Sequence, residues 1–233
     1  MTVTLASAVA RIERHGILLV FPIENRPEPR SLWSELYPRT RMRWEWDSEG
    51  DHRVGEVWHL RERLARSGKV VYAKWFRGRA TLFSKGVFRA MLASLNAAGD
   101  LRFGLSPRAA AILELLEDDS PQSTRELRRR ADMQGRANEA AYARALRELW
   151  TRMLVVGAGE VPDGAFPSLA IGATRLLFED LWLEASGSGA EDEALLARTF
   201  AGAPLFACEL DKARKLIARG ANEPDADALR DSR

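Results

Sequence analysis

The stretch from residue 106 to residue 171 constrains the fold more than any other part of this 233-residue chain. Ser106 and Pro107 supply a capping side chain and a proline for a first helical turn, and Ile112, Leu113, Leu115 and Leu116 follow at helical spacing. Ser123, with Glu126 three residues later, predicts a capping box that opens a short arginine-rich helix. Two capped helices are therefore expected before residue 134.

A third helix is expected after the turn at residues 134–137, with Asn138 as its cap. Tyr142 and Leu149 fall on one side of this helix, and Arg144 and Arg147 fall on the other. The apolar runs at 154–156 and 168–171, separated by an Asp-Gly pair, predict two strands joined by a flexible wing. Three helices followed by a hairpin predict an α+β fold that contains a winged helix-turn-helix module.

The charge of this module favours a DNA partner. Residues 122–152 hold eight arginines and four acids, and arginines neutralise phosphates while a helix of this size fits the major groove. The residues expected to contact DNA here are Arg125, Arg129, Arg136, Asn138, Arg144 and Arg147. Two alternatives stay open, since the arginines could solvate the outer faces of a small helical domain, and many winged helices bind protein instead.

The N-terminal half predicts a helix at 54–67 and then a hairpin that pairs 69–75 with 80–84. Lys74, Arg77 and Arg79 in this hairpin are further candidates for DNA contact. A helix followed by a basic hairpin repeats the tail of the later module, so this half is interpreted as a second, degenerate winged-helix-like domain. The expected organisation is a basic, Trp-rich α+β domain, a winged-helix domain, and a C-terminal helix pair with a tail, at residues 1–103, 104–185 and 186–233.

Residues 41–47 alternate in character and predict a strand with Trp44 and Trp46 on one face. Glu45 and Asp47 share the other face, where two carboxylates could orient a water for hydrolysis or pair with the arginines at 41 and 43. Tryptophan rings that lie among arginines and lysines in this region can stack on unpaired or flipped bases. They can equally build a core, which is the role expected for Trp33 and Trp58.

The composition is that of an ordinary globular protein, with a formal net charge of +2. The charge is uneven, because residues 26–89 hold fifteen basic and eight acidic side chains, whereas residues 174–233 hold eight and twelve. We expect a cytoplasmic protein, because the sequence has neither a cationic-then-apolar leader nor an apolar run of bilayer length. One cysteine and three scattered histidines predict no zinc site, and no cofactor or membrane partner is expected.

Several motifs together resemble the winged-helix DNA glycosylases typified by AlkZ. They are the run Ser123 to Arg130, the helix end Leu146-Arg147-Glu148-Leu149, the strand Met153 to Val156 and, more weakly, the hairpin Arg77 to Leu82. This resemblance implies tandem winged helices that bind duplex DNA and excise alkylated or crosslinked bases with a Gln-x-Gln or Gln-x-Asp motif. The chain departs from that motif, because its two glutamines, Gln122 and Gln134, are followed two positions later by Thr124 and Arg136.

Two functional hypotheses follow, with a protein-interaction module as a third. The favoured one is a non-enzymatic winged-helix protein that binds duplex DNA in repair or regulation. The alternative is a reduced glycosylase that hydrolyses the N-glycosidic bond of a damaged base. In that enzyme Glu45 or Asp47 would stabilise the sugar cation or orient water, and Trp44 or Trp46 would support the displaced base.

Overall fold

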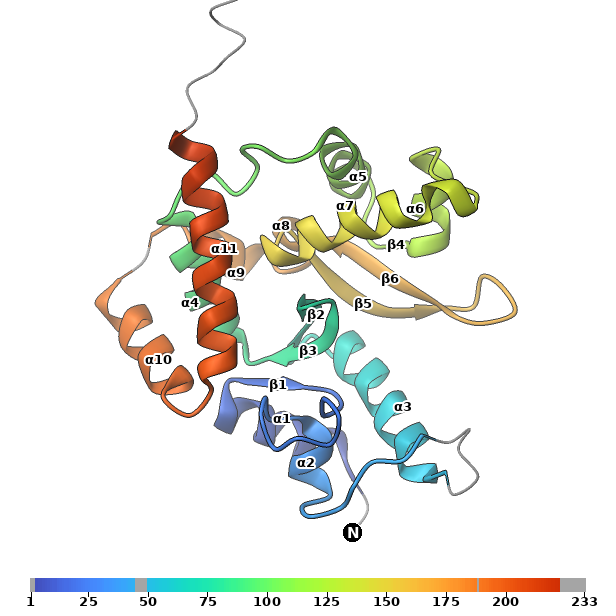
Figure 1. Ribbon diagram of the computed structural model, residues 1–233, viewed down its shortest axis with the longest axis vertical. Coiled ribbons are helices and arrows are strands. Elements are labelled where there is room, and N and C mark those ends of the chain that lie inside the picture. The colour runs from blue at the N-terminus through green and yellow to red at the C-terminus, as the bar shows by residue number, and fades with distance from the viewer. Residues whose placement is uncertain (1–2, 45–49, 188, 223–233) are drawn as a thin grey trace, which may run out of the picture.

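The computed structural model describes residues 3–44, 50–187 and 189–222, and it has a mixed α and β architecture (Figure 1). The first part of the chain contains α1 (Leu5–His15), β1 (Ile17–Leu19), α2 (Leu32–Leu36), α3 (His52–Arg66), β2 (Val71–Phe76), β3 (Arg79–Phe83) and α4 (Lys85–Asn96). The second part contains α5 (Pro107–Asp118), β4 (Gln122–Ser123), α6 (Thr124–Arg130), α7 (Glu139–Thr151), β5 (Val155–Val161), β6 (Ser168–Ala173), α8 (Thr174–Leu177) and α9 (Glu179–Glu184). The helices α10 (Ala190–Phe200) and α11 (Pro204–Asn222) follow.

The order helix, strand, helix, helix, strand, strand, helix occurs twice, first in α1–α4 and again in α5–α8. The strand pairing also repeats, because the last strand of each set lies antiparallel between the other two, as β1-β3-β2 and as β4-β6-β5. The two three-stranded sheets meet where β2 runs antiparallel to β5, with Tyr72 opposite Gly157. The strands therefore follow one another as β1-β3-β2-β5-β6-β4.

The packing across this junction is reciprocal. Helix α3 of the first half contacts β5 of the second half, and helix α7 of the second half contacts β2 of the first half. The apolar residues of α7 explain its orientation, since Tyr142, Ala145 and Leu149 are buried at helical spacing. The third helix of each half, α3 or α7, thus packs against a strand of the other half.

The main hydrophobic core extends through both halves and into the C-terminal helices. Helices α10 and α11 pack against α4 (Figure 1). Phe206 of α11 is fully buried, and its ring centroid lies 5.0 Å from that of Phe76 and 6.5 Å from that of Trp75. The predicted C-terminal helix pair is confirmed, and α11 closes the core behind the β2–β3 hairpin.

The predicted helix starts are confirmed at α5 and α6, but two capping details were wrong. Ser106 and Ser123 accept hydrogen bonds from the backbone N–H groups of Ala109 and Glu126. The Glu126 carboxylate, however, pairs with Arg129 instead of completing a capping box. Asn138 makes no side-chain cap, because it closes a 3-10 turn and its Nδ2 donates to the carbonyl of Gln134.

The predicted strand at 41–47 is wrong for residues 41–44, which have no regular secondary structure, while residues 45–47 lie outside the described part. The Asn25 side chain explains the difference, because its Oδ1 accepts from the backbone N–H of Met42 and its Nδ2 donates to the Met42 carbonyl. An amide that binds both backbone groups of one residue replaces the partner strand that those groups would need.

Candidate nucleic-acid interface

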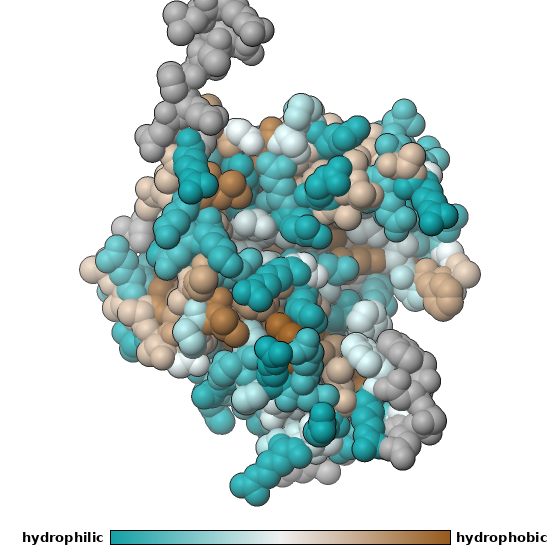
Figure 2. Space-filling view, in the orientation of Figure 1, coloured by the Kyte–Doolittle hydropathy of each residue, from teal (hydrophilic) through white to brown (hydrophobic). Residues whose placement is uncertain are grey.

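The outer face of α7 carries the cations that the sequence places there. Arg144 and Arg147 lie one helical turn apart and are exposed, and Arg136 is exposed in the 3-10 turn that precedes the helix. None of these three makes an ion pair with an acid in the described part of the chain, where the ion pairs involve other arginines. Figure 2 shows hydrophilic side chains along the outer sides of α6 and α7. This face therefore presents cations with free donors.

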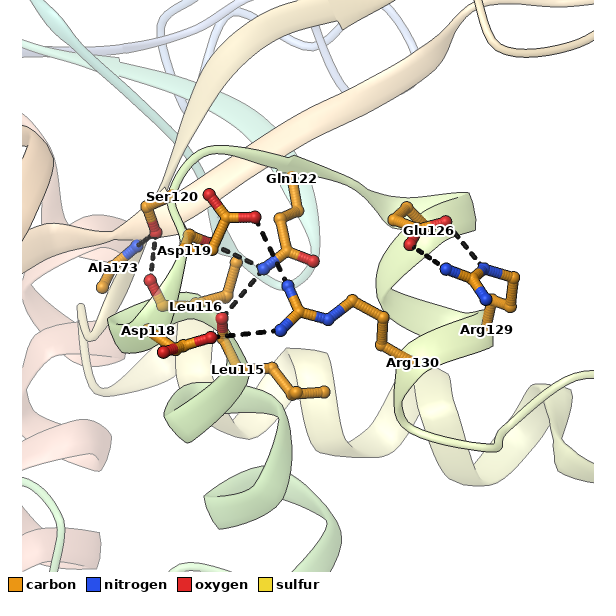
Figure 3. A network of polar contacts seen from close by, with 10 residues as sticks. All are labelled: Leu115, Leu116, Asp118, Asp119, Ser120, Gln122, Glu126, Arg129, Arg130 and Ala173. Atoms are coloured by element: carbon orange, nitrogen blue, oxygen red, sulfur yellow. Dashed lines mark hydrogen bonds and ion pairs between the residues drawn. The ribbon is translucent and has the colours of Figure 1, made fainter.

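The arginines of α6 are engaged within the protein. Arg129 Nε donates to Glu126 Oε2 at 2.9 Å (Figure 3), and this pairing raises the pKa of Arg129 and lowers the pKa of Glu126. Arg130 lies 3.3 Å from Asp118 and 3.4 Å from Asp119. Arg125 donates to the carbonyl of Asp163 in the β5–β6 loop. Of the six predicted DNA contacts of the module, the arginines of α6 are engaged, whereas those of α7 and of the turn before it are not engaged by other described residues. Asn138 in that turn donates to the carbonyl of Gln134.

The basic hairpin forms where it was predicted. Its two-residue turn has positive φ at both Arg77 (51°) and Gly78 (75°), which is the turn that matches the twist of paired strands. Arg79 is exposed, whereas Arg77 Nε lies 3.6 Å from Glu209 of α11. Lys74 is half-buried in β2, and burial, together with the nearby charge of Arg61, lowers its pKa.

A small cavity brings the hairpin and α7 together. Its volume is about 200 Å³, and Lys74 and Gly78 from the first half line it with Thr124, Ala143, Leu146, Arg147, Trp150 and Leu169 from the second half. Lys74 and Arg147, which are 73 positions apart in the chain, therefore share one cavity wall. A cation predicted from the hairpin and a cation predicted from the third helix thus line the same cavity.

The candidate catalytic residues Glu45 and Asp47 lie outside the described residues, as does Trp46. Trp44 is half-buried, with its ring centroid 5.4 Å from that of Phe21. Trp33 is buried as expected, but the expectation for Trp58 was wrong, because 44% of its surface is exposed. Trp58 stacks on the guanidinium of Arg61 at 4.0 Å, since Val57 and Leu60 take the inward face of α3.

Neither glutamine stands in a catalytic arrangement. Gln122 is buried, and its Nε2 donates to the carbonyls of Leu115 at 2.8 Å and Asp119 at 2.6 Å (Figure 3). This side chain ties the end of α5 to β4. Gln134 is exposed, and its backbone carbonyl accepts from Asn138. Gln122 therefore stabilises the connection between α5 and β4, and Gln134 lies in a surface turn.

Sequence reasoning missed a buried ion pair between the halves. Arg61 of α3 has 2% of its side chain exposed, and its Nη2 pairs with Glu160 of β5. Its Nη1 lies 3.4 Å from the hydroxyl of Tyr72, and Arg66 donates to the carbonyl of Glu160. Charged residues at mid-helix ordinarily face water, so only the contact between α3 and β5 reveals this role.

Comparison with known proteins adds one finding to this geometry. The model of the AlkZ-related family matches residues 2–193. The chain belongs to this family. Membership relates the AlkZ-related chain to DNA repair. No match was found among curated proteins or among solved structures.

Among the described residues of the AlkZ-related chain, no group of three or more His, Cys, Asp and Glu side chains is arranged to hold a metal ion. No helix in the same part of the chain combines the length and the apolar character needed to cross a bilayer.

Proposed function

We propose that each half of this AlkZ-related protein is a winged helix and that the protein binds duplex DNA in a repair-related role. The repeated order of elements and the repeated pairing of the first strand with the third support the winged-helix assignment. The proposed organisation keeps an N-terminal domain at 1–103, a second domain at 104–185 and a C-terminal segment at 186–233, around a shared core.

The observation that carries the proposal is the cation-rich face shared by the two halves. Arg136, Arg144 and Arg147 are exposed without acidic partners in the described part of the chain, and Arg147 shares a cavity with Lys74 from the basic hairpin. A third helix of this type presents its outer face to the major groove, while arginines and lysines on either side contact phosphates. Arg79 and Asn138 complete the proposed contacts, and Arg77, Arg125 and Arg129 join them if DNA displaces their present partners.

The test is binding to a labelled duplex across a salt series. The affinity of the wild-type protein is expected to fall steeply with salt, and an Arg144→Ala/Arg147→Ala variant is expected to lower the slope of log K against log salt by about 2. Arg130→Ala is the matched control, because Arg130 already pairs with Asp118 and Asp119 and should leave the slope unchanged. Salt-independent binding, or no binding at low salt, would exclude the proposal and leave a protein-interaction module.

The family match favours a second candidate function, the hydrolysis of the N-glycosidic bond of a damaged base. The Gln-x-Gln motif is absent, and the amide of Gln122 is bound to backbone carbonyls, so this activity would rest on Glu45 or Asp47. Release of an alkylated base by the wild-type protein, lost in a Glu45→Gln/Asp47→Asn variant that still binds duplex, would establish the enzyme. No release from any alkylated duplex that the protein binds would exclude it.

A further inference from the structure

Phe166 lies in the loop that joins β5 to β6, and 85% of its surface is exposed. It is the most exposed large apolar side chain in the described part of the molecule. Figure 2 shows hydrophobic atoms at the outer end of this loop. Burying a phenylalanine is worth about 2 kcal/mol, and a side chain held in water makes no such contribution to the fold. An aromatic ring in this position therefore points to an external partner.

The loop presents this ring on a constrained backbone. Pro162 and Pro167 fix φ on either side of the tip. Arg125 of α6 donates to the carbonyl of Asp163, and its guanidinium lies so close to Gly164 that a Cβ there would be 2.6 Å from Nη1. The tip is thus tied to the second helix of the module, which lowers the entropy lost when a partner binds.

The charges around the tip identify the partner. Arg125 on α6 contacts the loop through the Asp163 carbonyl. Arg129, one turn further along α6, pairs with Glu126, and 63% of its side chain is exposed. Two acids lie near the tip. Glu160 of β5 pairs with Arg61. Hydrogen bonds from Ser123 and Ser168, together with the charge of Arg125, lower the pKa of Asp163 in the loop. An apolar ring beside an exposed arginine suits a nucleic-acid duplex, because the ring can enter between bases while the cation contacts a neighbouring phosphate.

Residues 164–167 carry no polar side chain that could recognise a base edge, so the tip is suited to deforming DNA and not to reading its sequence. We propose that Phe166 inserts into the minor groove of the bound duplex and unstacks one base step, while Arg125 keeps the loop in place and Arg129 exchanges Glu126 for a flanking phosphate. This inference rests on the proposed function. It predicts a preference for steps with weak stacking, such as those at a mismatch or a damaged base, where insertion costs least.

The test follows binding and unstacking separately, with a duplex that carries 2-aminopurine beside a mismatch. The fluorescence of 2-aminopurine should rise when the wild-type protein binds, because the probe leaves the stack. Phe166→Ala should abolish this rise and weaken binding roughly tenfold, as expected for the loss of one base contact. The salt slope should not change, because no cation is removed. Phe166→Trp should retain the rise.

Leu183→Ala is the control, since Leu183 is another exposed apolar residue, 63% exposed on α9, and should change neither signal. Salt-dependent binding without any rise in fluorescence, or an undiminished rise in Phe166→Ala, would overturn the wedge and leave the proposed function intact. Sedimentation also tests the wedge. If the wild-type protein self-associates and Phe166→Ala loses both self-association and DNA binding, Phe166 is a contact between protein copies and the wedge is overturned. Failure of the wild-type protein to bind any duplex would refute the proposed function itself.

Discussion

Gly157 of β5 lies directly opposite Tyr72 of β2, and a Cβ added at residue 157 would stand 2.2 Å from the Tyr72 ring. The ring therefore occupies the space that a side chain at this position would take. Because β2 and β5 join the two sheets, this close approach determines how near the halves can pack.

We predict that Gly157→Ala lowers the free energy of unfolding by about 2 kcal/mol, since the Tyr72 ring is buried and backbone or ring must shift. Urea denaturation measures this change. Gly202→Ala is the control, because no atom lies within 4 Å of a Cβ at that position. Equal stabilities for the two variants would contradict the proposed role of Gly157.

The buried pair of Arg61 and Glu160 gives a second prediction. Glu160→Ala leaves the Arg61 charge buried without compensation, and we expect the free energy of unfolding to fall by about 3 kcal/mol. Replacing both partners, as Arg61→Met/Glu160→Leu, should cost less than this single change, because no isolated charge remains. Urea denaturation of both variants measures which one loses more free energy of unfolding. Asp211→Ala is the control, because it removes an exposed ion pair and should cost little. A double variant less stable than Glu160→Ala would disprove the explanation.

The contact between Arg77 and Glu209 predicts that α11 restrains the basic hairpin. Glu209→Gln should tighten duplex binding about twofold at low salt, because Arg77 then reaches phosphate without losing an ion pair. Fluorescence anisotropy measures the affinity. In an Arg77→Ala background, Glu209→Gln should leave the duplex affinity unchanged. A similar gain in affinity there would show that the lost negative charge of Glu209, and not the release of Arg77, causes the tighter binding.

Burial raises the pKa of Tyr142 to about 12, and this shift gives a prediction for alkaline pH. Tyr142 donates to the carbonyl of Thr124 and lies 4.7 Å beneath the guanidinium of Arg128. Because the folded pKa lies above the unfolded value near 10, the stabilisation is complete below pH 10 and declines as the pH rises toward 12.

Comparing urea denaturation at pH 9 and pH 11.5 isolates this group, because Tyr142→Phe should remove its part of the decline, which is on the order of 2 kcal/mol. At pH 9 the variant loses only the hydrogen bond to Thr124, worth about 1 kcal/mol. The same alkaline decline in both proteins would show that other groups cause it.

The elements of the second half could be predicted because their signals are local. Serine caps at 106 and 123, and the burial period of α7, act within a few residues of the chain. The basic hairpin was equally accessible, since Gly78 follows Arg77 between two apolar runs. Even the exposure of Trp58 had a signal, because it precedes Leu60 and follows Val57 on a helix whose inward face those two residues define.

The junction between the halves could not be predicted, because its contacts join distant positions. Arg61 pairs with Glu160, which is ninety-nine positions away in the sequence, and Arg125 donates to the carbonyl of Asp163, which is thirty-eight positions away. The division of the arginines into free and paired groups follows from such contacts. Composition therefore indicated a basic surface, whereas only the tertiary structure indicates which cations DNA would meet first.

For the proposed DNA-binding role, the antiparallel course of β2 and β5 predicts the length of duplex that one molecule would span. Because the strands run in opposite directions from the Tyr72 and Gly157 pair, the arginine turn at Gly78 and the loop at Gly164 lie at opposite ends of the joined sheet. At about 3.3 Å per residue the two tips are up to roughly 40 Å apart, close to one turn of B-form DNA. If the proposed duplex lies along the joined sheet, the protected footprint is expected to be about 12 base pairs.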